Sequence, residues 1–149
     1  MTGFQMLKCR ILSAFPGLLK IPADATNKEI GDIGEQVAVM YLRRRLYRIL
    51  KRNYKPYNNE IDIIAKKGGK ISFVEVKTRS AAPDSPYFRS AYRSVTYRQR
   101  KNIVCASKVY KKSHYAKSYS YSIIEVILKK TEKYLKISDI CFIPSAFRA

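Results

Sequence analysis

Residues 60–77 read EIDIIAKKGGKISFVEVK, two apolar runs separated by Gly68-Gly69. Paired glycines between two such runs are typical of a two-residue hairpin turn, from which both strands continue in antiparallel register. In that register Asp62 lies directly opposite Glu75, and Lys77 follows two residues later on the same face. The sequence therefore predicts a hairpin that brings two carboxylates and a lysine together among apolar side chains.

The two facing carboxylates indicate a metal site. Directly opposed Cβ atoms in a hairpin are only about 5 Å apart, so negative charges at Asp62 and Glu75 repel unless a cation lies between them. Carboxylate oxygens are the ligands that Mg²⁺ and Mn²⁺ prefer, with water and phosphate as further ligands. We therefore expect Asp62 and Glu75 to bind Mg²⁺ or Mn²⁺. We expect Lys77 to orient an attacking water or to offset phosphate charge.

An ordinary surface hairpin would also carry charged side chains. In the same register Glu60 lies opposite Lys77, and a solvated ion pair of this kind contributes little to stability. The apolar residues on both sides of Asp62 and Glu75 favour the metal site, because charges embedded in such segments are seldom without a role.

The composition indicates a polyanionic partner. The chain of 149 residues has 30 lysines and arginines against 11 acids, a formal net charge of +19 and a pI near 10.0. Residues 36–59 and 85–124 hold many of these cations and no acid. We expect nucleic acid, above all DNA, rather than a membrane, although net charge alone would suit DNA, RNA or an anionic membrane. The basic residues expected to hold the phosphate backbone are Arg43, Arg44, Arg52, Arg79, Arg98, Arg100 and Lys101.

Tyrosines accompany the second basic segment. Seven of the twelve tyrosines, from Tyr87 to Tyr121, are interleaved with its cations. Aromatic rings among cations can stack on bases. For most of these tyrosines a core position is the better interpretation, and Tyr119 and Tyr121 in particular share one face of an expected strand.

A capping box from Thr26 to Glu29 predicts the start of a helix that ends near Arg45. On this helix Glu35 falls on the broad apolar side, where a carboxylate needs a partner. Glu35 could be a third acid of the metal site, or it could pair with one of the many arginines. The sequence leaves both interpretations open.

A second capping box, from Thr96 to Gln99, predicts another helix. Its first turn contains Gln99, Arg100 and Lys101. Free N–H groups at a helix start attract anions, so these residues could meet phosphate, or they could simply be solvated.

Strands are predicted at residues 47–54, 118–128 and 133–137, in addition to the two strands of the hairpin. The resulting order is helix, strand, strand, strand, helix, strand, strand. It predicts a mixed α/β domain in which a three-strand meander is followed by a crossover helix. The segment after the hairpin contains Pro83 and Pro86, a composition that suits a mobile loop near a substrate.

Residues 26–149 are expected to form one domain, and residues 1–25 a loose N-terminal tail. The apolar run from Ile11 to Leu19 imitates a secretory signal only weakly, because Pro16 and Gly17 interrupt it. Three cysteines without close spacing indicate buried thiols in a reducing cytoplasm. The single histidine argues against a metal site built on histidine.

Several short motifs, in one consistent order, resemble those of the YraN family of small bacterial proteins. They are GDIGEQVA at residues 31–38, YL at 41–42, RNY at 52–54, EID at 60–62, FVEVKTR at 73–79 and QR at 99–100. The resemblance spans roughly residues 26–143. That family is similar to the PD-(D/E)XK nucleases and, among them, to the Holliday-junction resolvases.

The resemblance implies a restriction-endonuclease-like α/β fold, a mixed β-sheet flanked by helices. It implies that Asp62 and Glu75 are metal ligands, that Lys77 is the catalytic lysine and that Glu35 is an acid supplied by the helix. The implied activity is Mg²⁺- or Mn²⁺-dependent hydrolysis of DNA, selective for structure rather than sequence. The analogy with resolvases also allows a homodimer.

Two positions depart from the family pattern. Asn59 stands where glycine usually precedes Glu60, and Ser122-Ile-Ile-Glu125 stands where an Arg-Phe-Asp-like segment is common. Both departures leave the catalytic set intact and bear on local turn shape and substrate choice. A non-catalytic nucleic-acid-binding module with the same fold is the alternative interpretation of the chain.

Overall fold

The computed structural model describes residues 20–80 and 95–149. The elements, in chain order, are β1 (Lys20–Pro22), α2 (Asn27–Arg44), β2 (Arg48–Tyr54), β3 (Ile61–Lys67), β4 (Lys70–Ser80), α4 (Tyr97–Lys111), β5 (Ser118–Lys130) and β6 (Tyr134–Phe147). The predicted order of helices and strands is confirmed, with β1 added before it. Within the described residues, no helix is both long and apolar enough to cross a membrane.

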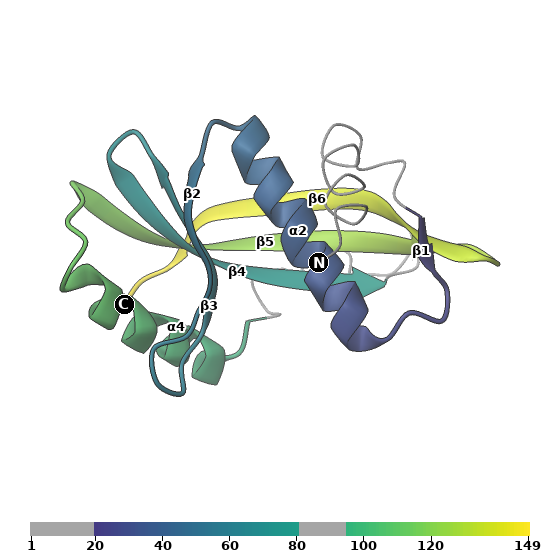
Figure 1. The fold of residues 1–149 in the computed structure, drawn as a ribbon, viewed down its shortest axis with the longest axis horizontal. Coiled ribbons are helices and arrows are strands. Elements are labelled where there is room, and N and C mark those ends of the chain that lie inside the picture. The colour runs from purple at the N-terminus through teal and green to yellow at the C-terminus, as the bar shows by residue number, and fades with distance from the viewer. Residues whose placement is uncertain (1–19, 81–94) are drawn as a thin grey trace, which may run out of the picture.

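The described strands form one mixed sheet in the order β1-β6-β5-β4-β3-β2. β4 and β5 are parallel, and the other neighbouring strands in this order are antiparallel. Parallel neighbours need a crossover connection, and α4 lies within that connection, as predicted. Figure 1 shows α2 lying across the long strands β4, β5 and β6, with α4 to one side of it. This mixed α/β architecture is the fold class that the sequence predicted.

The β3–β4 hairpin has the predicted register. Its ladder runs from Ile63 paired with Val74 to Lys67 paired with Lys70 at the turn. Gly68 and Gly69 join the strands at φ values of 56° and 81°. A type I′ turn requires such left-handed values at both central residues, and glycine adopts them without strain. The turn therefore fixes which residues of the two strands face each other.

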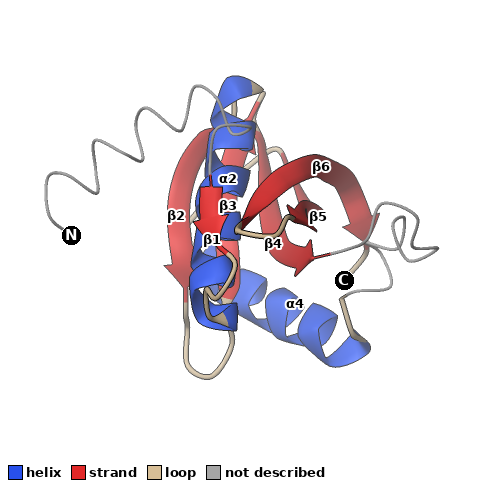
Figure 2. Ribbon diagram, turned by 90° about the vertical axis from the view of Figure 1, so that its right-hand side faces the viewer, coloured by secondary structure: helices blue, strands red, loops and turns tan. Residues whose placement is uncertain are grey.

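Two hydrophobic cores lie on the two faces of the sheet. α2 packs on one face, where Val74 and Val126 are buried, and α4 packs on the other, against Phe73 and Tyr121. Figure 2 shows the curled sheet, with the two helices over separate parts of it. Because side chains alternate along a strand, Glu75 lies on the α4 face with Phe73. The core interpretation of Tyr121 and its neighbour Tyr119 is confirmed.

Both predicted capping boxes are present. Thr26 and Glu29 exchange hydrogen bonds at the start of α2, and Thr96 and Gln99 do the same at the start of α4. Each box satisfies backbone N–H groups that have no partner inside the helix. The local sequence thus sets where each helix begins.

The N-terminal boundary of the domain differs from the prediction. Residues 20–25 were expected in a loose tail, but Lys20–Pro22 form β1, which pairs with β6 and buries Ile21. A strand of three residues has no periodic pattern of its own, and its partner is distant in sequence, so the residues alone do not reveal it. Residues 1–19, with the signal-like run, lie outside the described residues.

The last strand is longer than predicted. β6 continues to Phe147 instead of ending at residue 137, and it contains the polar pair Ser138-Asp139. Ser138 Oγ donates to the Ile127 carbonyl at 3.2 Å, beside a register shift in β5. An irregularity of this kind lets a strand continue through polar residues. The loop marked by Pro83 and Pro86 lies outside the described residues.

The expectation of buried thiols is wrong for the cysteines that the structure describes. Cys141, on β6, is exposed, and Cys105, on α4, is half-buried.

Candidate active site

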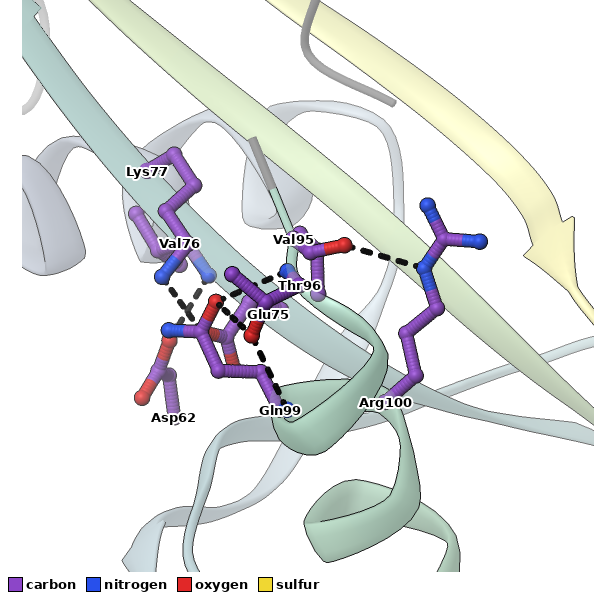
Figure 3. A network of polar contacts seen from close by, with 8 residues as sticks. All are labelled: Asp62, Glu75, Val76, Lys77, Val95, Thr96, Gln99 and Arg100. Atoms are coloured by element: carbon purple, nitrogen blue, oxygen red, sulfur yellow. Dashed lines mark hydrogen bonds and ion pairs between the residues drawn. The ribbon is translucent and has the colours of Figure 1, made fainter. Parts of the chain in front are cut away.

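Asp62 and Glu75 lie together, near the start of β3 and midway along β4. The β3–β4 ladder ends at the pair Ile63 and Val74, and Asp62 and Glu75 each lie one residue beyond this pair on their strands. Asp62 Oδ2 accepts a hydrogen bond of 2.7 Å from the Val76 backbone N–H, which ties this carboxylate to β4 (Figure 3). The turn chemistry of Gly68-Gly69 has therefore brought the two acids together, as predicted.

Lys77 belongs to the same cluster. Its Nζ lies 2.8 Å from Glu75 Oε1, and the two side chains are only 22% and 11% exposed. The alternative prediction, a solvated pair of Glu60 with Lys77, is wrong. Glu60 precedes β3 in the β2–β3 loop, and its Oε2 lies 3.3 Å from the Nζ of Lys55 in that loop.

With both acids ionised, the cluster would carry more negative than positive charge. Burial and repulsion from Glu75 raise the pKa of Asp62 to about 8. The Val76 N–H and the Lys77 ammonium act in the opposite direction and do not offset these two causes. One ammonium thus faces two carboxylates, an arrangement that a bound divalent cation would stabilise.

A pocket of about 250 Å³ opens beside the two carboxylates. Its lining, from the β2–β3 loop, β3, β4 and the first turns of α4, consists of Lys55, Asn58, Glu60, Asp62, Glu75, Gln99, Asn102 and Ile103. Figure 3 shows Gln99, on the first turn of α4, next to Glu75. Since this lining is mostly polar, the pocket suits water and phosphate better than an apolar ligand.

Glu35 lies beside the pair of acids without completing a three-acid site. Its Oε2 is 4.0 Å from Arg52 Nη2, and its charge contributes to the raised pKa of Asp62. Burial raises the pKa of Glu35 itself, as does repulsion from Asp32 and Glu60, while Arg52 lowers it. Among the described residues, no three Asp, Glu, His or Cys side chains group closely enough to hold one metal ion. Glu35 therefore pairs with an arginine and also acts electrostatically on the site.

Gly34 allows α2 to approach β4 closely enough to bring Glu35 to this position. A Cβ atom at Gly34 would lie 1.7 Å from Thr78 Oγ1 and 2.9 Å from Thr78 Cβ. No side chain fits into that space, so a hydrogen at this position is required by packing rather than by backbone conformation. Close packing against Thr78 therefore explains why glycine precedes Glu35 in the sequence.

The predicted nucleic-acid-binding residues lie on several elements, and none of them is among the residues that line the pocket. Arg98 and Lys101 are exposed on the first turns of α4, the helix that lines the pocket. Arg43 and Arg44 are exposed in the last turn of α2 and do not line the pocket. Arg52, on β2, contacts Glu35.

Arg100 points away from the carboxylates. Its Nε donates a hydrogen bond of 3.0 Å to the Val95 carbonyl, and its guanidinium lies 5.6 Å from the centre of the Phe147 ring. Figure 3 shows this side chain on the other side of the α4 start from Glu75. Helical geometry explains the difference, because consecutive residues point about 100° apart around the axis.

Arg79 is held by an acid that the sequence analysis did not assign to the site. Arg79 Nε lies 2.9 Å from Glu125 Oε1, and Glu125 is only 2% exposed. Glu125 is the neighbour of Lys77 in the parallel β4–β5 ladder. It interrupts an apolar strand just as Glu75 does, so the same signal could have identified it. Asn58 and Asn102 were also missed, because short polar residues in loops and helices carry no comparable signal.

Comparisons with known proteins identify relatives over most of the chain. Residues 34–128, which include Glu35, Asp62, Glu75 and Lys77, match the family model described as "Uncharacterised protein family UPF0102". A UPF0102 protein of Clostridium acetobutylicum is 38% identical over 125 residues, covering 82% of this chain and 96% of that protein. One of Chloroherpeton thalassium is 34% identical over 128 residues, covering 83% and 96%. One of Chlorobium phaeobacteroides is 46% identical over 81 residues, covering 54% and 61%.

Proposed function

The chain belongs to the UPF0102 family, the YraN family that its motifs resemble, and from its site we propose that it is a metal-dependent endonuclease that hydrolyses DNA phosphodiester bonds. The observation that carries the proposal is that Asp62 and Glu75 line one polar pocket and repel each other there, with Lys77 2.8 Å from Glu75. The resemblance to PD-(D/E)XK nucleases and the net charge of +19 support DNA as the substrate.

The donor set suits Mg²⁺ or Mn²⁺. Both of these cations prefer hard oxygen ligands and are commonly held by one or two carboxylates, with water and substrate phosphate as further ligands. Asp62 accepts a hydrogen bond from the Val76 N–H, Glu75 contacts Lys77, and these two carboxylates would hold the cation. When bound, such an ion polarises the phosphate and makes water a better nucleophile at neutral pH.

The chain's own residues have separate tasks in this proposal. Lys77 orients the attacking water and offsets the negative charge that develops on the phosphate, while its contact with Glu75 directs the ammonium into the site. Arg98 and Lys101, on the helix that lines the pocket, hold the DNA backbone. Backbone contacts carry no sequence information, so we propose selectivity for DNA structure rather than sequence.

Cleavage of a labelled DNA panel tests the proposal. The panel contains duplex, single-stranded, flap and four-way-junction DNA, each incubated with Mg²⁺ or Mn²⁺. Wild type should cut at least one structure, and Lys77→Ala and Asp62→Ala should each reduce the rate by about a hundredfold or more, because each removes a group that acts on the transition state. Asp139→Ala is a matched control, since Asp139 is an exposed aspartate on β6 that does not line the pocket.

Binding measurements on the same variants separate catalysis from recognition. Asp62→Ala should bind DNA as well as wild type or better, because it removes a negative charge beside the phosphate. Binding should weaken steeply with salt if cations hold the backbone. If wild type and variants bind the whole panel alike and none cuts, the chain is a non-catalytic nucleic-acid-binding module. If a DNA competitor fails to displace bound RNA, the substrate is RNA.

A further inference from the structure

The capping boxes of α2 and α4 differ in the residue type that completes them. In α2 this residue is Glu29, whose Oε2 accepts hydrogen bonds of 2.8 Å from both the backbone N–H and the hydroxyl of Thr26. In α4 it is Gln99, whose Oε1 accepts from the backbone N–H and the hydroxyl of Thr96 at 3.0 and 3.2 Å. Because the two boxes have the same pattern of contacts, capping alone does not explain why one holds an acid and the other an amide.

The start of a helix favours the acid. Hydrogen bonds from Thr26 lower the pKa of Glu29, so the box stabilises the ionised form of this side chain. A carboxylate in the first turn also interacts favourably with the partial positive charge of the helix N-terminus. α4 has no acid in its first turn and lacks both contributions. Helix stability therefore does not account for Gln99.

The capping box fixes the direction of the Gln99 amide. The Thr96 backbone N–H can only donate, so the atom that it meets is the amide oxygen, and Nε2 lies on the other side. Figure 3 shows this nitrogen turned away from Thr96, toward the side where Asp62 and Lys77 lie. Gln99 is half-buried and lines the carboxylate pocket, and its Nε2 makes no hydrogen bond within residues 20–80 and 95–149. The N–H groups of this amide are thus available to a ligand in the pocket.

We propose that Gln99 donates a hydrogen bond from Nε2 to an oxygen of the scissile phosphate, so that the capping box of α4 also positions the substrate. Glutamine side chains are among the groups that contact phosphate oxygens in protein–DNA complexes. A carboxylate in this place would repel the phosphate, whereas an amide adds donors without charge. The inference rests on the proposed function and adds a phosphate-binding residue to it.

A simpler explanation is that Gln99 only keeps a third negative charge away from Asp62 and Glu75. Any neutral side chain of similar size would then serve equally well. Gln99→Met separates the two explanations, because it removes the amide and adds no charge. Gln99→Glu is its complement, because it keeps the acceptor that completes the box, as Glu29 does in α2, and removes the donor. The lost donor is the change that both variants share.

DNA binding without metal ions gives a readout that does not depend on cleavage. The variants are made in Asp62→Asn, which removes one of the two carboxylate charges and so lets a phosphate approach the pocket in EDTA. The probe is the labelled DNA structure that this parent binds most tightly, followed by fluorescence anisotropy. Gln99→Met should weaken binding by about tenfold, the effect of one hydrogen bond to a charged group. Gln99→Glu should weaken it further, because it also places a negative charge beside the phosphate.

The capping box of α2 supplies the matched control. Glu29→Met and Gln99→Met each remove the side chain that completes a box, and each should lower the urea midpoint. Only Gln99→Met should weaken DNA binding, since Glu29 is exposed and does not line the carboxylate pocket. Unchanged binding in Gln99→Met, or an equal loss of binding in both methionine variants, would overturn the inference.

The cleavage assay separates failure of this inference from failure of the proposed function. If Gln99→Met and Gln99→Glu weaken DNA binding but wild type cuts no DNA, the nuclease proposal fails and the phosphate contact stands. If wild type cuts DNA in an Asp62-dependent manner, but Gln99→Met binds as its parent does and cuts as wild type, the phosphate contact fails alone.

Discussion

Acids interrupt the apolar strands in two regions of the α4 face. The two regions differ in how cations balance the charge of these acids. On β5, Glu125 is 2% exposed and meets one base, because its Oε1 lies 2.9 Å from Arg79 Nε. On β3 and β4, Asp62 and Glu75 share the single ammonium of Lys77. The first region is balanced in charge, while the second would have an excess of one negative charge with both of its acids ionised.

The causes of the pKa shifts show the same difference. Burial raises the pKa of Glu125, and the neighbouring Arg79 opposes this. Burial also raises the pKa of Asp62, but there repulsion from Glu75 and Glu35 adds to it. Burial of an acid therefore does not by itself mark a functional site. Like charges held close together are a more specific sign of a functional site, because folding alone would not favour them.

The largest expected loss of stability comes from removing Glu125, the acid of the balanced region. Glu125→Ala should lower the free energy of unfolding by about 2–3 kcal/mol, because it leaves the partly buried guanidinium of Arg79 without its partner. Glu75→Ala should have a much smaller effect, since it also removes repulsion from Asp62. Urea denaturation of both variants measures the difference.

A double variant checks the origin of that loss. Glu125→Met/Arg79→Met removes both charges and fills the space with apolar atoms, which is often neutral for buried ion pairs. It should therefore be more stable than Glu125→Ala. Equal losses for Glu125→Ala and Glu75→Ala would contradict the distinction between the two regions.

The next prediction concerns the packing of α2 on β4, the strand that carries Glu75 of one region and Arg79 of the other. Gly34→Ala should destabilise the protein by about 2 kcal/mol, because the new Cβ would overlap Thr78, which lies on β4 between Lys77 and Arg79. Gly31→Ala is the matched control on the same helix. A Cβ at Gly31 meets nothing within 4 Å, so this variant should gain about 0.5–1 kcal/mol from the helix propensity of alanine. Thermal unfolding of the two variants should show opposite shifts, and two shifts in the same direction would contradict the close approach.

The excess charge at Asp62 predicts a pH dependence of stability. The folded pKa of about 8 is above the ordinary value of 3.8, so between these values the native state holds a proton that the unfolded chain releases. Stability without metal ions should therefore fall by at least about 1 kcal/mol as pH rises from about 5 to about 8. Asp62→Asn should remove most of this dependence, as measured by urea denaturation in EDTA.

Two further measurements sharpen this prediction. Glu35→Gln should remove only a small part of the pH dependence, because Glu35 contributes less than Glu75 to the pKa of Asp62. Saturating Mg²⁺ should restore stability at about pH 8 in wild type and not in Asp62→Asn, since ligand binding to the native state stabilises it. Stability of wild type that rises with pH over this range would show that the two carboxylates do not repel.

The sequence predicted the hairpin, both helix starts and the meeting of Asp62, Glu75 and Lys77. These features depend on local chemistry, namely a glycine turn, two capping boxes and a period-two pattern. It did not predict β1 or the contact of Arg79 with Glu125, because both depend on pairing between segments that are distant in sequence.

The side of an element on which a residue lies was harder to predict than the existence of the element. Arg98, Arg100 and Lys101 were grouped as phosphate-binding residues, yet Arg100 turns away from the pocket toward Val95 and Phe147. Which side of a helix faces a site depends on how the helix packs, and that requires the whole core. The exposed rings of Tyr57 and Tyr97 were likewise not separable from core tyrosines by composition alone.

The smallest expected effect concerns backbone strain beside the region with excess charge. Tyr57→Gly should raise the free energy of unfolding by about 0.5 kcal/mol, because glycine adopts the φ of 57° without steric cost, partly offset by the greater entropy of the unfolded chain. Tyr115→Gly is the matched control, since Tyr115 is not among the described residues with positive φ. It should lower the free energy of unfolding by a similar amount, because only the entropic part applies.

Urea midpoints of Tyr57→Gly and Tyr115→Gly, compared at one pH, measure this difference in sign. If Tyr57→Gly is also less stable than wild type, the loop is not strained. If it is more stable but binds DNA less tightly, stability and binding are in opposition at one residue. Such an opposition is expected where a site keeps a residue for its ligand rather than for the fold. It would place Tyr57 with Asp62 and Glu75, in the region that folding alone leaves unbalanced.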